Sequence, residues 1–209
     1  QKFSQAHELV EFLINSLPNG KNIGNGWTLK KPGGFTESMK EILCNRTAAN
    51  ILMPPAYVAD QINQHGTNFG CARLISNECE ISLSAALVQV ARISRGSHSV
   101  ILWIMKNKPS EIKEKIPASQ LGLFGDKPSQ PALKLRVEWS MGSESAPFIP
   151  KDKSVEETSL IFKACQTGSF TSGEERLCLN GKKSRWFRTE NLPFRAAGGT
   201  QVLSLIEHI

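Results

Sequence analysis

Three residues near the start of the chain have the types and the spacing of a metal-dependent hydrolytic site. His7, Glu8 and Glu11 lie in the stretch AHELVEF. Residues four apart share one face of a helix, so His7 and Glu11 would point the same way. In the pattern H-E-x-x-H, both histidines bind zinc and the glutamate activates a water molecule. Because Glu11 replaces the second histidine, the stretch predicts a metal site with a carboxylate ligand, an inactive remnant of one, or a plain polar helix face.

A second stretch, EILCNRTAANILMPP at 41–55, adds a family resemblance. Together with AHEL it resembles the ImmA/IrrE family of zincin-like metallo-endopeptidases, whose second helix has the form E-x-x-A/C-N-x-F-A-A-x-x-L-M-P. The matching positions are Glu41, Cys44, Asn45, Ala48, Ala49, Leu52, Met53 and Pro54. The resemblance implies that Glu41 is the third metal ligand beside His7 and Glu11. It also implies that Glu8 is the catalytic general base.

The resemblance implies zinc as the cofactor, but this chain departs from the family pattern at the ligands. Glu11 in place of histidine adds a negative charge, which makes the metal a poorer Lewis acid and favours harder ions such as Mn²⁺. Zinc, manganese or no metal therefore remain open. Val10 replaces the usual glycine and Thr47 the usual phenylalanine. His65, His98 and His208 are expected to be ordinary histidines, because none lies near the motif in sequence.

The remainder of the chain extends the resemblance. Residues 81–94 resemble the small helix-turn-helix segment of the family, and residues 146–209 resemble the GAF-like tail of its longer IrrE-type members. These likenesses imply an α+β fold with three domains: a zincin-like helical core at 1–66, a helix-turn-helix-like unit at 67–96 and a GAF-like antiparallel sheet with a packed helix at 97–209. The family's segment preceding AHEL is expected to be missing, and with it the substrate-binding edge.

Apolar periodicity and breaker residues predict the individual elements. Helices are expected over 4–16, 36–53, 56–64, 69–77, 83–93 and 154–166, and strands over 98–106, 133–141 and 201–207. Asn180-Gly181 predicts a hairpin between strands at 175–179 and 182–188. The proline-rich stretch 107–131 and the glycine-rich stretch 19–35 are expected to be irregular.

Composition limits the class of protein. The net charge is +6 and the pI about 9.1, but the excess is spread over several clusters, which favours solvated faces over a nucleic-acid surface. No apolar run reaches the ~18 residues that a membrane span requires. A signal peptide is not expected, because QKFSQAHEL lacks a cationic start followed by an apolar core. Five cysteines without a C-x-x-C pair indicate a reduced, cytoplasmic protein without a membrane partner.

Three functions remain open from the sequence. The first is a bacterial or phage metallopeptidase that cleaves a repressor-type transcription regulator in a stress or mobile-element response. The second is an inactive pseudopeptidase that senses or binds, with a possible homodimer through the GAF-like half. The third is a DNA-binding regulator that works through residues 69–94. Its candidate recognition helix begins with Leu83, Ser84, Ala85 and Ala86 and offers only Gln89 and Arg92 later.

Overall fold

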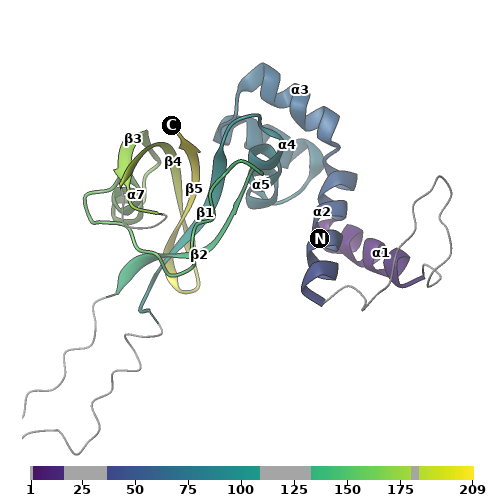
Figure 1. The fold of residues 1–209 in the computed structure, drawn as a ribbon, viewed down its shortest axis with the longest axis horizontal. Coiled ribbons are helices and arrows are strands. Elements are labelled where there is room, and N and C mark those ends of the chain that lie inside the picture. Colours follow the sequence, from purple (N-terminus) through teal and green to yellow (C-terminus); the bar gives the residue numbers. More distant parts are fainter. Residues whose placement is uncertain (1, 17–36, 109–132, 180–183) are drawn as a thin grey trace, which may run out of the picture. The chain divides into compact units, whose positions relative to one another are not determined.

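The computed structural model describes residues 2–16, 37–108, 133–179 and 184–209 (Figure 1). The glycine-rich stretch, nearly all of 107–131 and the hairpin turn predicted at Asn180-Gly181 lie outside these ranges. The chain divides into two compact units, Gln1–Ile93 and Ser94–Ile209. The described part of the first contains only helices, and that of the second an antiparallel sheet with one helix, so the chain is of the α+β class. No described helix has the length and apolar character needed to cross a membrane.

The helical unit contains α1 (Lys2–Ser16), α2 (Glu37–Leu52), α3 (Pro55–His65), α4 (Phe69–Cys79) and α5 (Leu83–Ile93). Small side chains bring α1 and α2 together, because Ala6, Val10, Cys44 and Ala48 are the buried residues of this pair. Helix α2 ends at Leu52, separated by one residue from the Pro54-Pro55 pair. Helix α3 begins with a proline, which is tolerated in the first turn because no amide donor is needed there.

The two later helices of this unit are fixed by caps and an apolar face. Asn68 begins α4, and its side chain accepts a hydrogen bond from the Cys71 amide at 2.9 Å. Ser82 does the same for the Ala85 amide at the start of α5. The buried face of α5 contains Ala86, Leu87 and Val90 at helical spacing. Helices α3, α4 and α5 contact one another and form one packed group.

The sheet unit has five strands in the order β2-β1-β5-β4-β3, all antiparallel. Their bounds are β1 His98–Lys106, β2 Lys134–Gly142, β3 Thr171–Leu177, β4 Arg185–Ala196 and β5 Gly199–His208. Helix α7 (Leu160–Thr167) packs against β3, β4 and β5. The core between sheet and helix includes Trp103, Val137, Ile161, Ala164 and Ile206, all fully buried.

Two predicted elements differ from the structure. The helix expected over 154–166 begins only at Leu160, because the Ser159 side chain caps it by accepting from the Phe162 amide at 3.0 Å. Before it, the Val155 amide donates to the Leu135 carbonyl at the edge of β2. The two hairpin strands pair in antiparallel fashion as predicted, with Leu177 opposite Arg185, but their bounds differ: β3 begins four residues earlier and ends two residues earlier than predicted, and β4 begins three residues later and ends eight residues later.

Candidate helix-pair site

Helices α1 and α2 bring the two motif segments side by side. His7 follows the buried Ala6, and its side chain is 18% exposed. Glu41 comes from the first half of α2 and its side chain is 63% exposed. The distance from His7 Nε2 to Glu41 Oε1 is 3.3 Å. The structure therefore places a histidine and a carboxylate from the two motifs in contact, at the rim of the helix pair.

The His7–Glu41 contact is close without being a hydrogen bond. Nε2 of His7 is buried, and it has no hydrogen-bond partner within the described ranges. Glu41 Oε1 accepts a hydrogen bond of 3.0 Å from Asn45 Nδ2, one turn further along α2. Asn45 thus orients the carboxylate that faces His7. A buried ring nitrogen without a donor or acceptor is costly, so this atom is the least satisfied polar group of the pair.

Glu11 is engaged elsewhere. Its Oε1 lies 2.8 Å from Nζ of Lys40, which donates a hydrogen bond to it. That bond and the positive charge of Lys40 lower the pKa of the Glu11 carboxyl group, and the same bond raises the pKa of Lys40. The Lys40 side chain as a whole is only 19% exposed, so much of it packs against the helix pair. Cys44, one turn along α2, is buried, and burial raises the pKa of its thiol.

The four predicted site residues are therefore not arranged as a three-ligand metal centre. No three histidine, cysteine, aspartate or glutamate side chains in the described part of the chain form a group that could hold a metal ion. His7 and Glu41 lie together, whereas Glu11 binds Lys40. Glu8 is on the exposed side of α1. A zinc or manganese ion does not fit this arrangement, because a cationic side chain already holds one of the three carboxylate and imidazole donors.

The helix-turn-helix-like unit uses its polar residues for packing. Gln89 on α5 is 1% exposed, and its side-chain amide donates to Asn50 Oδ1 at 3.2 Å and to the Met53 carbonyl at 3.1 Å. Arg92 also donates to Asn50. Both residues thus tie α5 to the end of α2. The side chains expected to be available for base contacts are occupied inside the helical unit.

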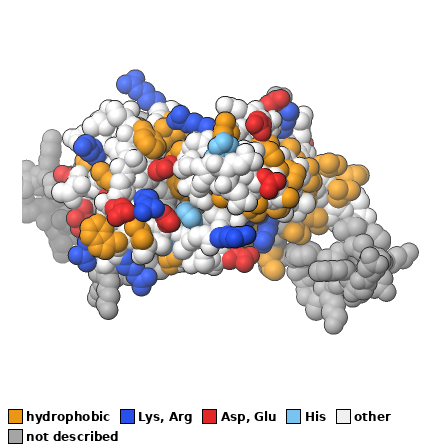
Figure 2. Space-filling model, turned by 90° about the horizontal axis from the view of Figure 1, so that it is seen from above, with side chains coloured by type: hydrophobic (Ala, Val, Ile, Leu, Met, Phe, Trp, Pro, Cys, Tyr) orange, Lys and Arg blue, Asp and Glu red, His pale blue; other side chains and the backbone are white. Residues whose placement is uncertain are grey.

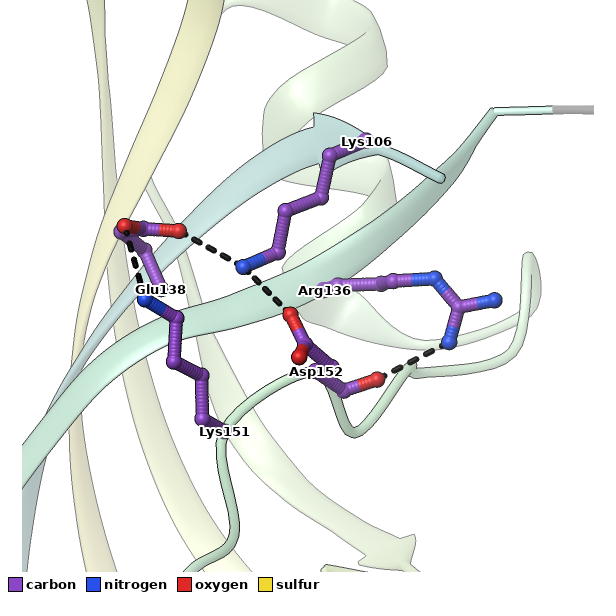
Figure 3. A network of polar contacts seen from close by, with 5 residues as sticks. All are labelled: Lys106, Arg136, Glu138, Lys151 and Asp152. Carbon is purple, nitrogen blue, oxygen red and sulfur yellow. Dashed lines mark hydrogen bonds and ion pairs between the residues drawn. The ribbon is translucent and has the colours of Figure 1, made fainter. Parts of the chain in front are cut away.

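The sheet unit has a polar groove that the sequence did not reveal. Its volume is ≈ 1130 Å³, and it is lined by β2, the segment 150–159, α7 and β3. Close to it, Lys106 Nζ lies 2.6 Å from both Glu138 and Asp152 (Figure 3). Lys151 also contacts Glu138, at 3.3 Å. Hydrogen bonds from Lys106 lower the pKa of both carboxyl groups, so this network is an ionised cluster that fastens 150–153 to the sheet.

Sequence reasoning missed Lys40, the residue that decides the state of Glu11. Lys40 directly precedes Glu41, but its relation to α1 depends on how the two helices cross, which no local pattern reveals. Comparison with protein families and with curated proteins adds no information on the site, because no family model and no curated protein matches the sequence.

Proposed function

We propose that this chain is a non-cleaving relative of the ImmA/IrrE metallopeptidases that acts by binding a repressor-type transcription regulator. One observation carries the proposal: the residue at the second ligand position, Glu11, is held by Lys40 at 2.8 Å. A metallopeptidase needs a divalent ion that polarises the substrate and lowers the pKa of a bound water. A carboxylate that is neutralised by a lysine does not hold such an ion, so both effects are lost. A packed helix pair can still bind a protein.

Exposed apolar side chains on the same helices support a binding role. Leu9 and Phe12 on α1 are 52% and 66% exposed, and Met39 and Ile42 on α2 are 56% and 64% exposed. Large apolar side chains exposed on neighbouring helices are typical of protein-binding surfaces. The DNA-binding alternative has less support, because Gln89 and Arg92 are used internally. On the face that Figure 2 shows, basic and acidic side chains are also interspersed.

The test uses the repressor-type regulators encoded beside the gene for this chain. Each is mixed with the full-length protein in the presence of Zn²⁺, of Mn²⁺ or of a chelator. Calorimetry measures binding and intact mass measures cleavage. We expect binding without cleavage, with the same affinity in all three conditions. Glu8→Gln, which removes the candidate general base, is expected to change neither result. Cleavage that the chelator and Glu8→Gln both abolish would overturn the proposal in favour of an active peptidase.

That active metallopeptidase is the second candidate, and one observation favours it. Among the described residues, Nε2 of His7 is buried without a hydrogen-bond partner and lies 3.3 Å from Glu41 Oε1, so an imidazole and a carboxylate, two groups that bind divalent ions, lie together. In this reading Lys40 would have to release Glu11, so that His7, Glu11 and Glu41 would hold the ion and Glu8 would activate a water molecule. Elemental mass spectrometry of the purified protein separates the two candidates, since only the second requires about one equivalent of metal.

The sheet unit is, in this proposal, a GAF-like sensor. Its antiparallel sheet with one packed helix supports the coarse likeness, and the polar groove between β2 and β3 offers a place for a regulatory contact. A homodimer through this unit follows the same analogy. Sedimentation of residues 94–209 at increasing concentration would test the dimer.

A further inference from the structure

At Glu11, a metal ion and the Lys40 ammonium group would compete for the same carboxylate. A metal site formed by His7, Glu11 and Glu41 would carry two negative charges and would need a cation to offset them. The structure contains a cation beside this group of residues, the Lys40 ammonium, bound to Glu11 through a 2.8 Å hydrogen bond. Lys40 is largely shielded from solvent, and Asn45 holds Glu41 in place next to His7. The charge that a metal would provide is therefore partly supplied by the protein itself.

We propose that Lys40 is a resident cation that replaces the metal ion and keeps divalent cations out of the helix pair. This inference deepens the proposed function and rests on it for the identity of the three ligand positions. A tethered ammonium group is always present at high effective concentration, so it competes with a free ion without needing to be acquired. The ammonium group also repels an approaching divalent cation. By binding Glu11 it occupies one of the three ligand positions.

Two features of the helix pair make the replacement self-consistent. A lysine donates hydrogen bonds but cannot accept one from His7, so the imidazole is left with the Glu41 carboxylate as its neighbour, as observed. Glu11 in turn is a better partner for an ammonium than histidine would be, because only the carboxylate carries a full negative charge. Glu11, in place of the histidine, and Lys40 thus act together as an ion pair and are not two unrelated changes.

The experiment measures metal binding instead of activity. ZnCl₂ and MnCl₂ are titrated separately into the full-length protein and its variants by calorimetry, with metal content checked by elemental mass spectrometry. Lys40→Met is the main variant, and Lys40→Gln is a second one that keeps polarity. Lys2→Met is the matched control, since Lys2 is also part of an ion pair of α1, with Glu80 at 2.9 Å. The double variant Glu11→Gln with Lys40→Met tests whether Glu11 becomes the ligand.

We expect the natural protein and Lys2→Met to bind neither ion measurably, and both Lys40 variants to bind about one equivalent with at least tenfold higher affinity. The double variant should lose this gain. Binding of one equivalent by the natural protein as tight as in Lys40→Met would overturn the inference. So would folded Lys40 variants, judged by circular dichroism, that gain nothing. These results are independent of the cleavage assay, so the inference and the proposed function can fail separately.

Discussion

At the scale of single residues, the sheet unit contains a histidine whose protonation is coupled to folding. His208 Nε2 lies 2.9 Å from Ser99 Oγ, and its ring meets Phe187 edge-on at 5.0 Å. Burial, together with the nearby His98 and Arg185, lowers the pKa of His208 to about 4. The folded protein therefore binds this proton more weakly than the unfolded chain, in which the pKa is about 6.5.

The direction of the pH effect follows from this difference. The stabilisation from neutral His208 is complete above pH 6.5 and is lost as the pH falls from 6.5 towards 4. Allowing for partial solvent exposure, the loss should be about 1–3 kcal/mol in the free energy of unfolding. We expect His208→Gln to be less sensitive to acid than the natural protein. Urea unfolding followed by tryptophan fluorescence at pH 7.5 and 4.5 measures this.

The matched control for this prediction is His65→Gln, because His65 is exposed in the helical unit. It should retain the full loss of stability at pH 4.5. An equal loss in His208→Gln and in the natural protein would show that His208 is protonated in the folded state and that the acid sensitivity arises elsewhere.

Part of the candidate helix-pair site could be predicted from its sequence motifs. The types and spacing of His7 and Glu11 predict a candidate site on one face of α1, and the second motif places Glu41 on α2. Which of these carboxylates faces His7 depends on the crossing of two helices that are separated by twenty residues in sequence. Lys40 has no motif of its own. Its pairing with Glu11 is a product of packing and could not be derived from either segment alone.

At the scale of elements, helix ends decide where prediction succeeds. The apolar periodicity of 69–77 and 83–93 predicted helices with nearly the observed bounds, and the structure shows that the Asn68 and Ser82 side chains cap them. For 154–166, Val155 has helical spacing with Ser159 and Phe162, but its amide pairs with Leu135 on β2 instead. The long-range hydrogen bond between Val155 and Leu135 therefore prevents the helix that the local apolar spacing predicts. Apolar periodicity carries no information about such long-range bonds.

The end of α7 supplies a second prediction. Gly168 ends the helix with φ +65°, and its amide donates to the Ala164 carbonyl at 3.0 Å. An added Cβ would meet no atom within 4 Å there. Gly168→Ala should therefore lower the free energy of unfolding by about 1 kcal/mol through left-handed backbone strain alone.

Gly198, in the turn before β5, is the natural comparison. It also has no atom within 4 Å of an added Cβ, but its φ is not in the left-handed region. Gly198→Ala should change the free energy of unfolding by less than about 0.5 kcal/mol. Chemical denaturation of both variants measures the contrast. Equal effects at the two glycines would mean that backbone conformation at Gly168 is not the cause.

At the scale of the whole molecule, the division between Ile93 and Ser94 separates two kinds of stabilisation. The sheet unit has a continuous core from Ile101 on β1 to Ile206 on β5, covered by α7. Beneath the same helix, a buried polar chain runs from the Trp103 indole through Ser204 to Asn191, with every link hydrogen-bonded. The α1–α2 pair, by contrast, buries mainly four small side chains.

This contrast predicts that the sheet unit folds alone. Residues 94–209 expressed by themselves should give a strand-rich circular dichroism spectrum and one cooperative thermal transition, because all residues of their core lie within the fragment. In the fragment of residues 1–93, the α1–α2 pair should melt at a lower temperature than the packed group of α3, α4 and α5, since so little apolar surface is buried between the first two helices. Calorimetry of both fragments and of the full chain compares the transitions. A fragment 94–209 without a cooperative transition would show that its core depends on the helical unit.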